Sequence, residues 1–137
     1  MVLFLAMSLF IFTFAVINNQ THQTMFRIAI IGGENTMNYE MFKEKCIHYL
    51  KNKVKDGIII LTTGDEYVTH FAQKYKIDTQ FYATKWRKYK NNALKMRNDE
   101  LLSNTDAIIY FNDGIKDNMY LYNEALHRNI PSRIVNY

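Results

Sequence analysis

The segment Phe26–Tyr39, FRIAIIGGENTMNY, contains the pattern that decides the fold. It begins with a short, mainly apolar run, which predicts a strand buried on both faces, as in a parallel sheet covered by helices. Gly32 and Gly33 follow this strand, and the cap of a helix comes next. A glycine pair at the carboxyl end of a strand lets the backbone approach a ligand closely, and it also forms ordinary turns. The full GxGxxG fingerprint of dinucleotide-binding proteins is absent, because Glu34, Asn35 and Thr36 follow the pair.

The rest of the chain alternates short apolar runs with stripes at helical spacing. Further strands are predicted at 58–61, 80–82, 107–111 and 132–135, and helices within 39–53, 68–75, 94–102 and 119–126. The segment 84–92 shows no period and is expected to be a loop. This order predicts an α/β fold: a single doubly wound, Rossmann-like domain with a mostly parallel sheet flanked by helices.

Composition limits the chain to one ordinary core. It has 137 residues, of which 48% are hydrophobic and 22% charged. The formal net charge of +4 suits an anionic small ligand or nucleic acid but requires neither. Cys46 is the single cysteine, which excludes a disulfide framework within the chain and fits a reducing compartment. The four histidines show no ligand spacing, so we expect no metal site.

Residues 1–24 differ from everything that follows. The run 1–17 is almost wholly apolar, and no charged residue occurs in the whole segment. Three interpretations stay open: a membrane anchor, a mis-assigned start with Met25 as the true first residue, and a cleaved signal. An anchor would have its basic residues on the carboxyl side, which places the domain at 25–137 in the cytoplasm or facing it.

Four of the five glycines follow predicted strands, namely Gly32, Gly33, Gly64 and Gly114. Parallel strands joined by right-handed crossovers end at the same edge of a sheet. These glycines are therefore expected at one rim, where open α/β sheets bind ligands. A ligand site there is favoured over the alternative that loops simply need glycine.

Arg97 and Asn98 stand out in the helix predicted near 94–102. Arg97 lies three residues after Leu94 and four before Leu101, so its guanidinium is expected beside the apolar stripe, which is costly unless it meets an anion. The alternative is a solvated arginine next to an asparagine that bonds a helix–loop junction. Trp86 could stack a base together with a neighbouring tyrosine, or it could cover the edge of the sheet.

These features resemble the YspA-type branch of the SLOG superfamily over residues 26–136. The resemblance is carried by the Gly-Gly turn with Asn38-Tyr39, Gly64, Ala72 and Tyr75, Trp86 with Tyr89 and Ala93, Arg97-Asn98, Thr105-Asp106-Ala107 and the run FNDG at 111–114. The spacing of Trp86, Tyr89 and Arg97-Asn98 is its most specific part. The resemblance implies a Rossmannoid fold related to DprA and to the LOG-type phosphoribohydrolases. It also implies a sensor or effector of nucleotide-derived ligands, often in phage or defence settings.

The chain departs from this family at its phosphate-binding turns. Asp65, Glu66 and Tyr67 stand where a second glycine-rich turn is expected, and Asn118-Met119 replaces a Gly-Thr pair. Such glycines let backbone amides cradle a phosphate at a helix N-terminus. The Pro-Gly-Gly-x-Gly-Thr motif of the LOG-type enzymes is also missing, so their glycosidic hydrolysis is not implied.

Two functions of different classes follow from these patterns. The first is a binding module or sensor for a nucleotide or a nucleotide-derived ligand, such as an ADP-ribose derivative. Its expected pocket consists of Gly32, Gly33, Gly64, Trp86, Arg97, Asn98 and Gly114. The alternative is single-stranded nucleic-acid binding by the basic and aromatic run 85–90. A nucleotide-processing hydrolase is a weaker third hypothesis, because no catalytic residue can be assigned.

Overall fold

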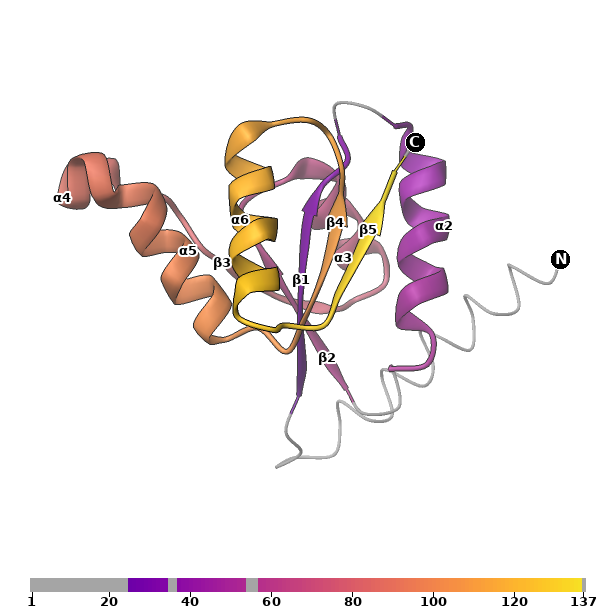
Figure 1. Cartoon of the computed structure of the whole chain (residues 1–137). Coiled ribbons are helices and arrows are strands. Elements are labelled where there is room, and N and C mark those ends of the chain that lie inside the picture. The colour runs from indigo at the N-terminus through magenta and orange to yellow at the C-terminus, as the bar shows by residue number, and fades with distance from the viewer. Residues whose placement is uncertain (1–24, 35–36, 54–56, 137) are drawn as a thin grey trace, which may run out of the picture.

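The computed structural model of the chain describes residues 25–34, 37–53 and 57–136. They contain a five-stranded sheet in which all neighbouring strands are parallel, in the order β3-β2-β1-β4-β5 (Figure 1). The strands are β1 (Phe26–Gly32), β2 (Ile58–Thr62), β3 (Asp78–Phe81), β4 (Ala107–Phe111) and β5 (Ser132–Val135). The chain moves outward from β1 to β3 and then returns to the other side of β1, so the strand order reverses between β1 and β4. The predicted doubly wound, Rossmann-like α/β domain is confirmed.

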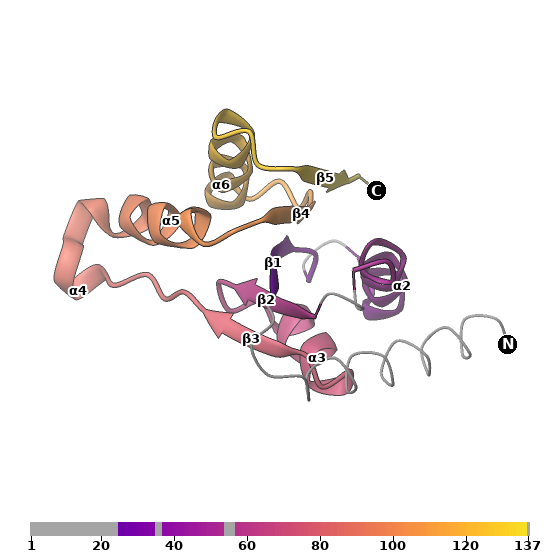
Figure 2. The same ribbon diagram turned by 90° about the horizontal axis from the view of Figure 1, so that it is seen from below.

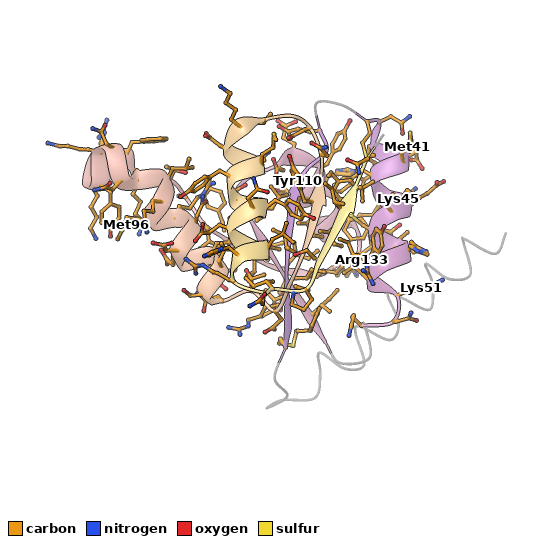
Figure 3. All side chains as sticks on the ribbon, viewed as in Figure 1. Met41, Lys45, Lys51, Met96, Tyr110 and Arg133 are labelled. Atoms are coloured by element: carbon orange, nitrogen blue, oxygen red, sulfur yellow. The ribbon has the colours of Figure 1, made fainter. Side chains whose placement is uncertain are left out.

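Helices cover both faces of the sheet. The helices are α2 (Tyr39–Leu50), α3 (Glu66–Lys74), α5 (Ala93–Ser103) and α6 (Lys116–His127). Figure 2 shows α2 and α3 on one face and α5 and α6 on the other. Because side chains of a strand alternate between faces, Ile28 and Ile30 enter the α2/α3 core while Ala29 and Ile31 enter the α5/α6 core. In Figure 3, the labelled Tyr110 of β4 lies behind α6, in this second core.

One local prediction is wrong: the segment 84–92 is not a loop. It contains a single helical turn, α4 (Trp86–Tyr89), and a 3-10 turn at Lys90–Asn92. The amides of Lys88 and Tyr89 both donate to the carbonyl of Lys85, at 3.1 and 3.0 Å. None of the residues of α4 is buried, so the turn leaves no apolar stripe in the sequence.

This segment forms the end of a projection that we call the arm, residues 82–98. Figure 2 shows α4 at its outer end, farther from the sheet than α5 and on the same side, with α5 returning toward β4. The arm therefore presents surface that the two cores do not cover. It also brings the first half of α5 close to the carboxyl ends of β2 and β3, since Arg97 reaches Thr84 just after β3.

The predictions for the N-terminal segment 1–24 concern residues outside the described part of the chain. Within the described ranges, no helix is long and apolar enough to span a bilayer. Anchor, signal and mis-assigned start all stay predictions, and so does the cytoplasmic location. Cys46 is fully buried in the α2/α3 core, and burial raises the pKa of its thiol well above the usual value.

Candidate functional site

The four glycines that follow strands lie at one rim of the sheet, as the crossover rule predicts. Gly32 and Gly33 end β1, Gly64 follows β2 and Gly114 follows β4, and these strands all run in the same direction. The rim between β1 and β4 is the point where the strand order reverses. Open α/β sheets bind ligands at such a point.

Packing explains two of these glycines without a ligand. Gly32 has φ +84°, and a Cβ there would overlap the carbonyl oxygen of Phe111 on the neighbouring strand. Gly33 has φ +110°, and a Cβ would lie 2.9 Å from the ring of Phe42. Positive φ and close approach both require glycine. Ligand contact by these glycines stays a prediction.

The backbone amides of the rim already have acceptors within the protein. The amide of Gly32 donates to Oδ2 of Asp65 at 3.2 Å, and the amide of Gly64 donates to Oγ1 of Thr62 at 3.0 Å. In a phosphate-binding loop, amides at these positions point at the ligand. Here they stabilise the turns themselves.

Two carboxylates at the same rim accept from amides at helix starts, one at the first residue of α3 and one at the residue before α6. Oε2 of Glu34 accepts from the amide of Glu66, the first residue of α3, at 2.7 Å. Oδ1 of Asp113 accepts from the amide of Ile115, which caps α6, at 3.0 Å. Negative side chains stabilise helix N-termini in this way. Both helix starts are therefore already provided with an anion.

The centre of the rim is acidic. Burial raises the pKa of Asp65, and the nearby charges of Glu34 and Asp113 raise it further, against the bond from the Gly32 amide. Within the described ranges, no group of three or more His, Cys, Asp or Glu residues is placed to hold a metal ion. The sequence did not reveal this acidic centre, because it comes from residues far apart in the chain.

Arg97 lies beside this centre, at the root of the arm. Its Nε and Nη2 donate to Oδ1 of Asn98 at 3.1 and 2.8 Å, and its Nη1 donates to Oγ1 of Thr84 at 3.1 Å. Burial lowers the pKa of Arg97, while the charges of Asp117 and Asp65 oppose that shift. The guanidinium is thus half-buried and interacts electrostatically with the acidic rim, and its three hydrogen bonds within the described residues all go to neutral oxygens.

The pair of Arg97 and Asn98 has more donors than acceptors. A guanidinium carries five N–H groups, and three of them are used here. Because a guanidinium only donates, it must face the oxygen of Asn98, which fixes the orientation of that amide. Asn98 is 1% exposed, and its Nδ2 finds no partner among the described residues. A buried donor without a partner costs about 1–3 kcal/mol.

Trp86 does not lie with the glycine turns. It belongs to α4 at the end of the arm and is 57% exposed. The neighbouring Tyr82 is buried in the α5/α6 core, and Tyr89 is covered by the ammonium of Lys88 at 5.1 Å from the ring centre. The predicted pocket thus divides into a rim with the glycines, Arg97 and Asn98 nearby, and a separate arm with Trp86.

Two hollows flank these residues, and sequence reasoning missed both. One, of about 290 Å³, lies in the arm and is lined by Lys85, Tyr89, Met96 and Arg97 among others. Figure 3 shows Met96 on the outer side of α5. The other, of about 540 Å³, adjoins the rim between α2 and α3 and is lined by Tyr39, Gly64, Glu66, Tyr67, Thr69, His70 and Gln73.

Aromatic rings form one wall of this rim hollow. The ring of Tyr39 meets His70 and Tyr67 edge-on, with centroids 4.7 and 5.5 Å apart. Burial raises the pKa of Tyr39 to about 12, so its hydroxyl stays protonated at neutral pH. A flat apolar ring of a ligand fits such a wall, because aromatic groups stack on or meet one another edge-on.

Comparisons of the chain with protein-family models, with curated proteins and with solved structures found no match. The resemblance to the SLOG superfamily therefore depends on the sequence motifs alone. The chemistry of the rim has to be inferred from its own geometry, namely a half-buried guanidinium near a group of carboxylates.

Proposed function

We propose that this domain is a binding module or sensor for a nucleotide or nucleotide-derived small ligand at the carboxyl rim of the sheet. The observation that carries the proposal is the half-buried guanidinium of Arg97 near Asp65, which among the described residues uses three of its five N–H groups, all on neutral oxygens. An anionic group of a ligand would accept from the remaining two. The YspA-type SLOG resemblance supports the same ligand class and suggests a phage or defence setting.

Each part of such a ligand has a matching group at the rim. Arg97 offers a charge-assisted bond to an anionic group. The carboxylate of Asp65 accepts bonds from sugar hydroxyls, as acidic residues do in dinucleotide-binding folds. The hollow beside Gly64, with Tyr39 and His70 in its wall, accepts a base.

A thermal-shift screen tests this proposal. The probes are nucleotides, dinucleotides and ADP-ribose derivatives, and a ligand that binds only the folded state raises the melting temperature. The shift should shrink in Arg97→Lys, which keeps the charge but loses the bidentate fork. Arg87→Ala is the matched control, because Arg87 is exposed on α4. A set of probes that leaves the melting temperature unchanged would refute the proposal.

A second candidate function, single-stranded nucleic-acid binding, is favoured by the charge of the arm. Between Asp78 and Asp99 the chain has six of its basic residues and no acidic one. The other eleven basic and thirteen acidic residues leave the rest of the chain at −2, so the net positive charge belongs to this stretch. The exposed ring of Trp86 lies among these cations, as electrostatic grooves with stacking platforms require.

Salt dependence separates the two functions. Polarisation of a labelled oligothymidylate measures binding to the arm, and its affinity should fall steeply with salt, with a log–log slope of about −0.7 per phosphate contacted. Trp86→Ala should weaken it by about 1–3 kcal/mol through lost stacking. A small ligand at the rim should respond far less to salt, and unchanged oligonucleotide binding in Trp86→Ala would contradict the role of the arm.

A further inference from the structure

The positions where a Rossmann-like rim normally binds phosphate are filled by the protein itself. The first amide of α3 bonds to Glu34, the amide at the cap of α6 bonds to Asp113, and the amide of Gly32 bonds to Asp65. A phosphate chain placed along the rim would have to displace these carboxylates from their donors. It would also gain few new amides, since Gly64 already donates to its own turn.

The same carboxylates repel a chain of phosphates. Glu34 and Asp113 each lie close enough to Asp65 for their charges to act on it, and burial strengthens such interactions. A triphosphate brings about four negative charges to this place, and like charges brought together in an interface weaken binding. Asp117, in the first turn of α6, adds a further acidic group near Arg97.

The rim offers carboxylate oxygens that can accept bonds from hydroxyl groups, and a single guanidinium. Within the described residues, one oxygen of Asp65 accepts a bond, from Gly32, and its second oxygen can take a ligand hydroxyl. Arg97 keeps two N–H groups, which match one anionic group and not a chain of them. The side-chain oxygen of Asn98 holds this guanidinium in place by accepting two of its bonds.

We infer that the rim selects a nucleoside or nucleoside monophosphate and rejects the corresponding di- and triphosphates. The inference rests on the proposed function and specifies its ligand class. The sugar hydroxyls bond to the carboxylates of the rim, and the single phosphate bonds to Arg97. The carboxylates therefore act as specificity-determining residues, because they favour hydroxyl groups and exclude further anions.

Titration calorimetry on the full chain tests the inference. The probes are the four ribonucleosides with their 5′-monophosphates and 5′-triphosphates, in a buffer with EDTA so that no divalent cation neutralises the phosphates. We expect a monophosphate to bind about ten-fold or more tightly than its triphosphate, the factor that corresponds to about 1.4 kcal/mol of repulsion. Triphosphate binding of equal or greater strength would overturn the inference and leave the proposed function intact.

The variant Glu34→Gln tests whether the carboxylates of the rim cause the preference for a monophosphate over its triphosphate. Glutamine keeps an oxygen for the amide of Glu66 but removes one charge. The ratio of the affinity for the monophosphate to that for the triphosphate should therefore fall several-fold. Glu44→Gln is the control, since Glu44 is exposed on α2 and lies in a different part of the molecule. If Glu34→Gln leaves this affinity ratio unchanged, the carboxylates do not cause the selectivity and the inference is overturned. If no probe binds the parent protein, the proposed function fails together with this inference.

Discussion

The centre of the rim and the root of the arm use their polar groups in opposite ways. At the centre, the amides of Gly32, Gly64 and Glu66 each meet an acceptor from the protein. At the root of the arm, Arg97 and Asn98 have donors left over, one of them buried. Native proteins pair nearly all buried polar groups, so the exceptions need an explanation. This difference is the reason why our proposal assigns the anionic group of the ligand to Arg97, and only its hydroxyl groups to the carboxylates at the centre.

The largest loss of stability is expected from a substitution at the centre of the rim. Gly32→Ala places a Cβ against the carbonyl of Phe111 at a φ of +84°, and the backbone of two adjacent strands cannot move apart cheaply. The free energy of unfolding should fall by more than about 3 kcal/mol. Urea denaturation followed by far-ultraviolet circular dichroism measures this loss.

Gly114→Ala is the matched control for that variant. Gly114 also has a positive φ, of +74°, but a Cβ there meets nothing within 4 Å. Its cost should be limited to the left-handed conformation itself, about 1–2 kcal/mol. Equal losses in Gly32→Ala and Gly114→Ala would show that close packing of β1 against β4 does not set the cost at Gly32.

Arg97 should affect ligand affinity more than any other residue at the root of the arm. A charge-assisted hydrogen bond contributes about 1.5–3 kcal/mol, so Arg97→Ala should weaken the best probe from the thermal-shift screen roughly ten- to a hundred-fold. Calorimetry measures the loss. Arg97→Lys should recover part of the affinity, and a variant with the affinity of the parent would remove Arg97 from the site.

Asn98→Ala should lower stability even without ligand. The substitution removes the oxygen that accepts two bonds from Arg97, and the free energy of unfolding should fall by about 1 kcal/mol. Arg97→Ala removes the same bonds, so it also costs stability, which the sequence alone does not predict. Urea denaturation of both single variants and of the double variant checks this coupling, and additive losses would contradict it.

The smallest expected effect is a gain, in Asp65→Asn at neutral pH. The pKa of Asp65 is raised in the folded state, so its charge costs stability above that pKa, and the cost disappears as the pH falls through it. Asparagine keeps an acceptor for Gly32 without the charge. The variant should unfold at higher urea than the parent at pH 7 and lose this advantage near pH 4. A loss of stability at pH 7 that disappears near pH 4 would contradict this prediction and would mean that Gly32 requires the charged group.

The sequence predicted the sheet well and the rim only in part. Apolar runs and glycines located the strands, and the spacing from Leu94 and Leu101 placed Arg97 beside the apolar stripe of α5, where it is half-buried. The bond from Glu66 to Glu34 could not be predicted, because a pattern along the chain does not show which side chain reaches an amide 32 residues away. The turn α4 was missed because its exposed residues carry no period.

The exposed position of the only tryptophan has a spectroscopic consequence. Trp86 is 57% exposed on the arm, so its emission should resemble that of an indole in water in the folded protein as well as in the unfolded chain. Tyr75 and Tyr110, by contrast, are buried in the two cores, one on each face of the sheet. Loss of the core should therefore be visible in the near-ultraviolet dichroism of tyrosine and nearly invisible in tryptophan fluorescence, which makes Trp86 a built-in reporter of the arm alone.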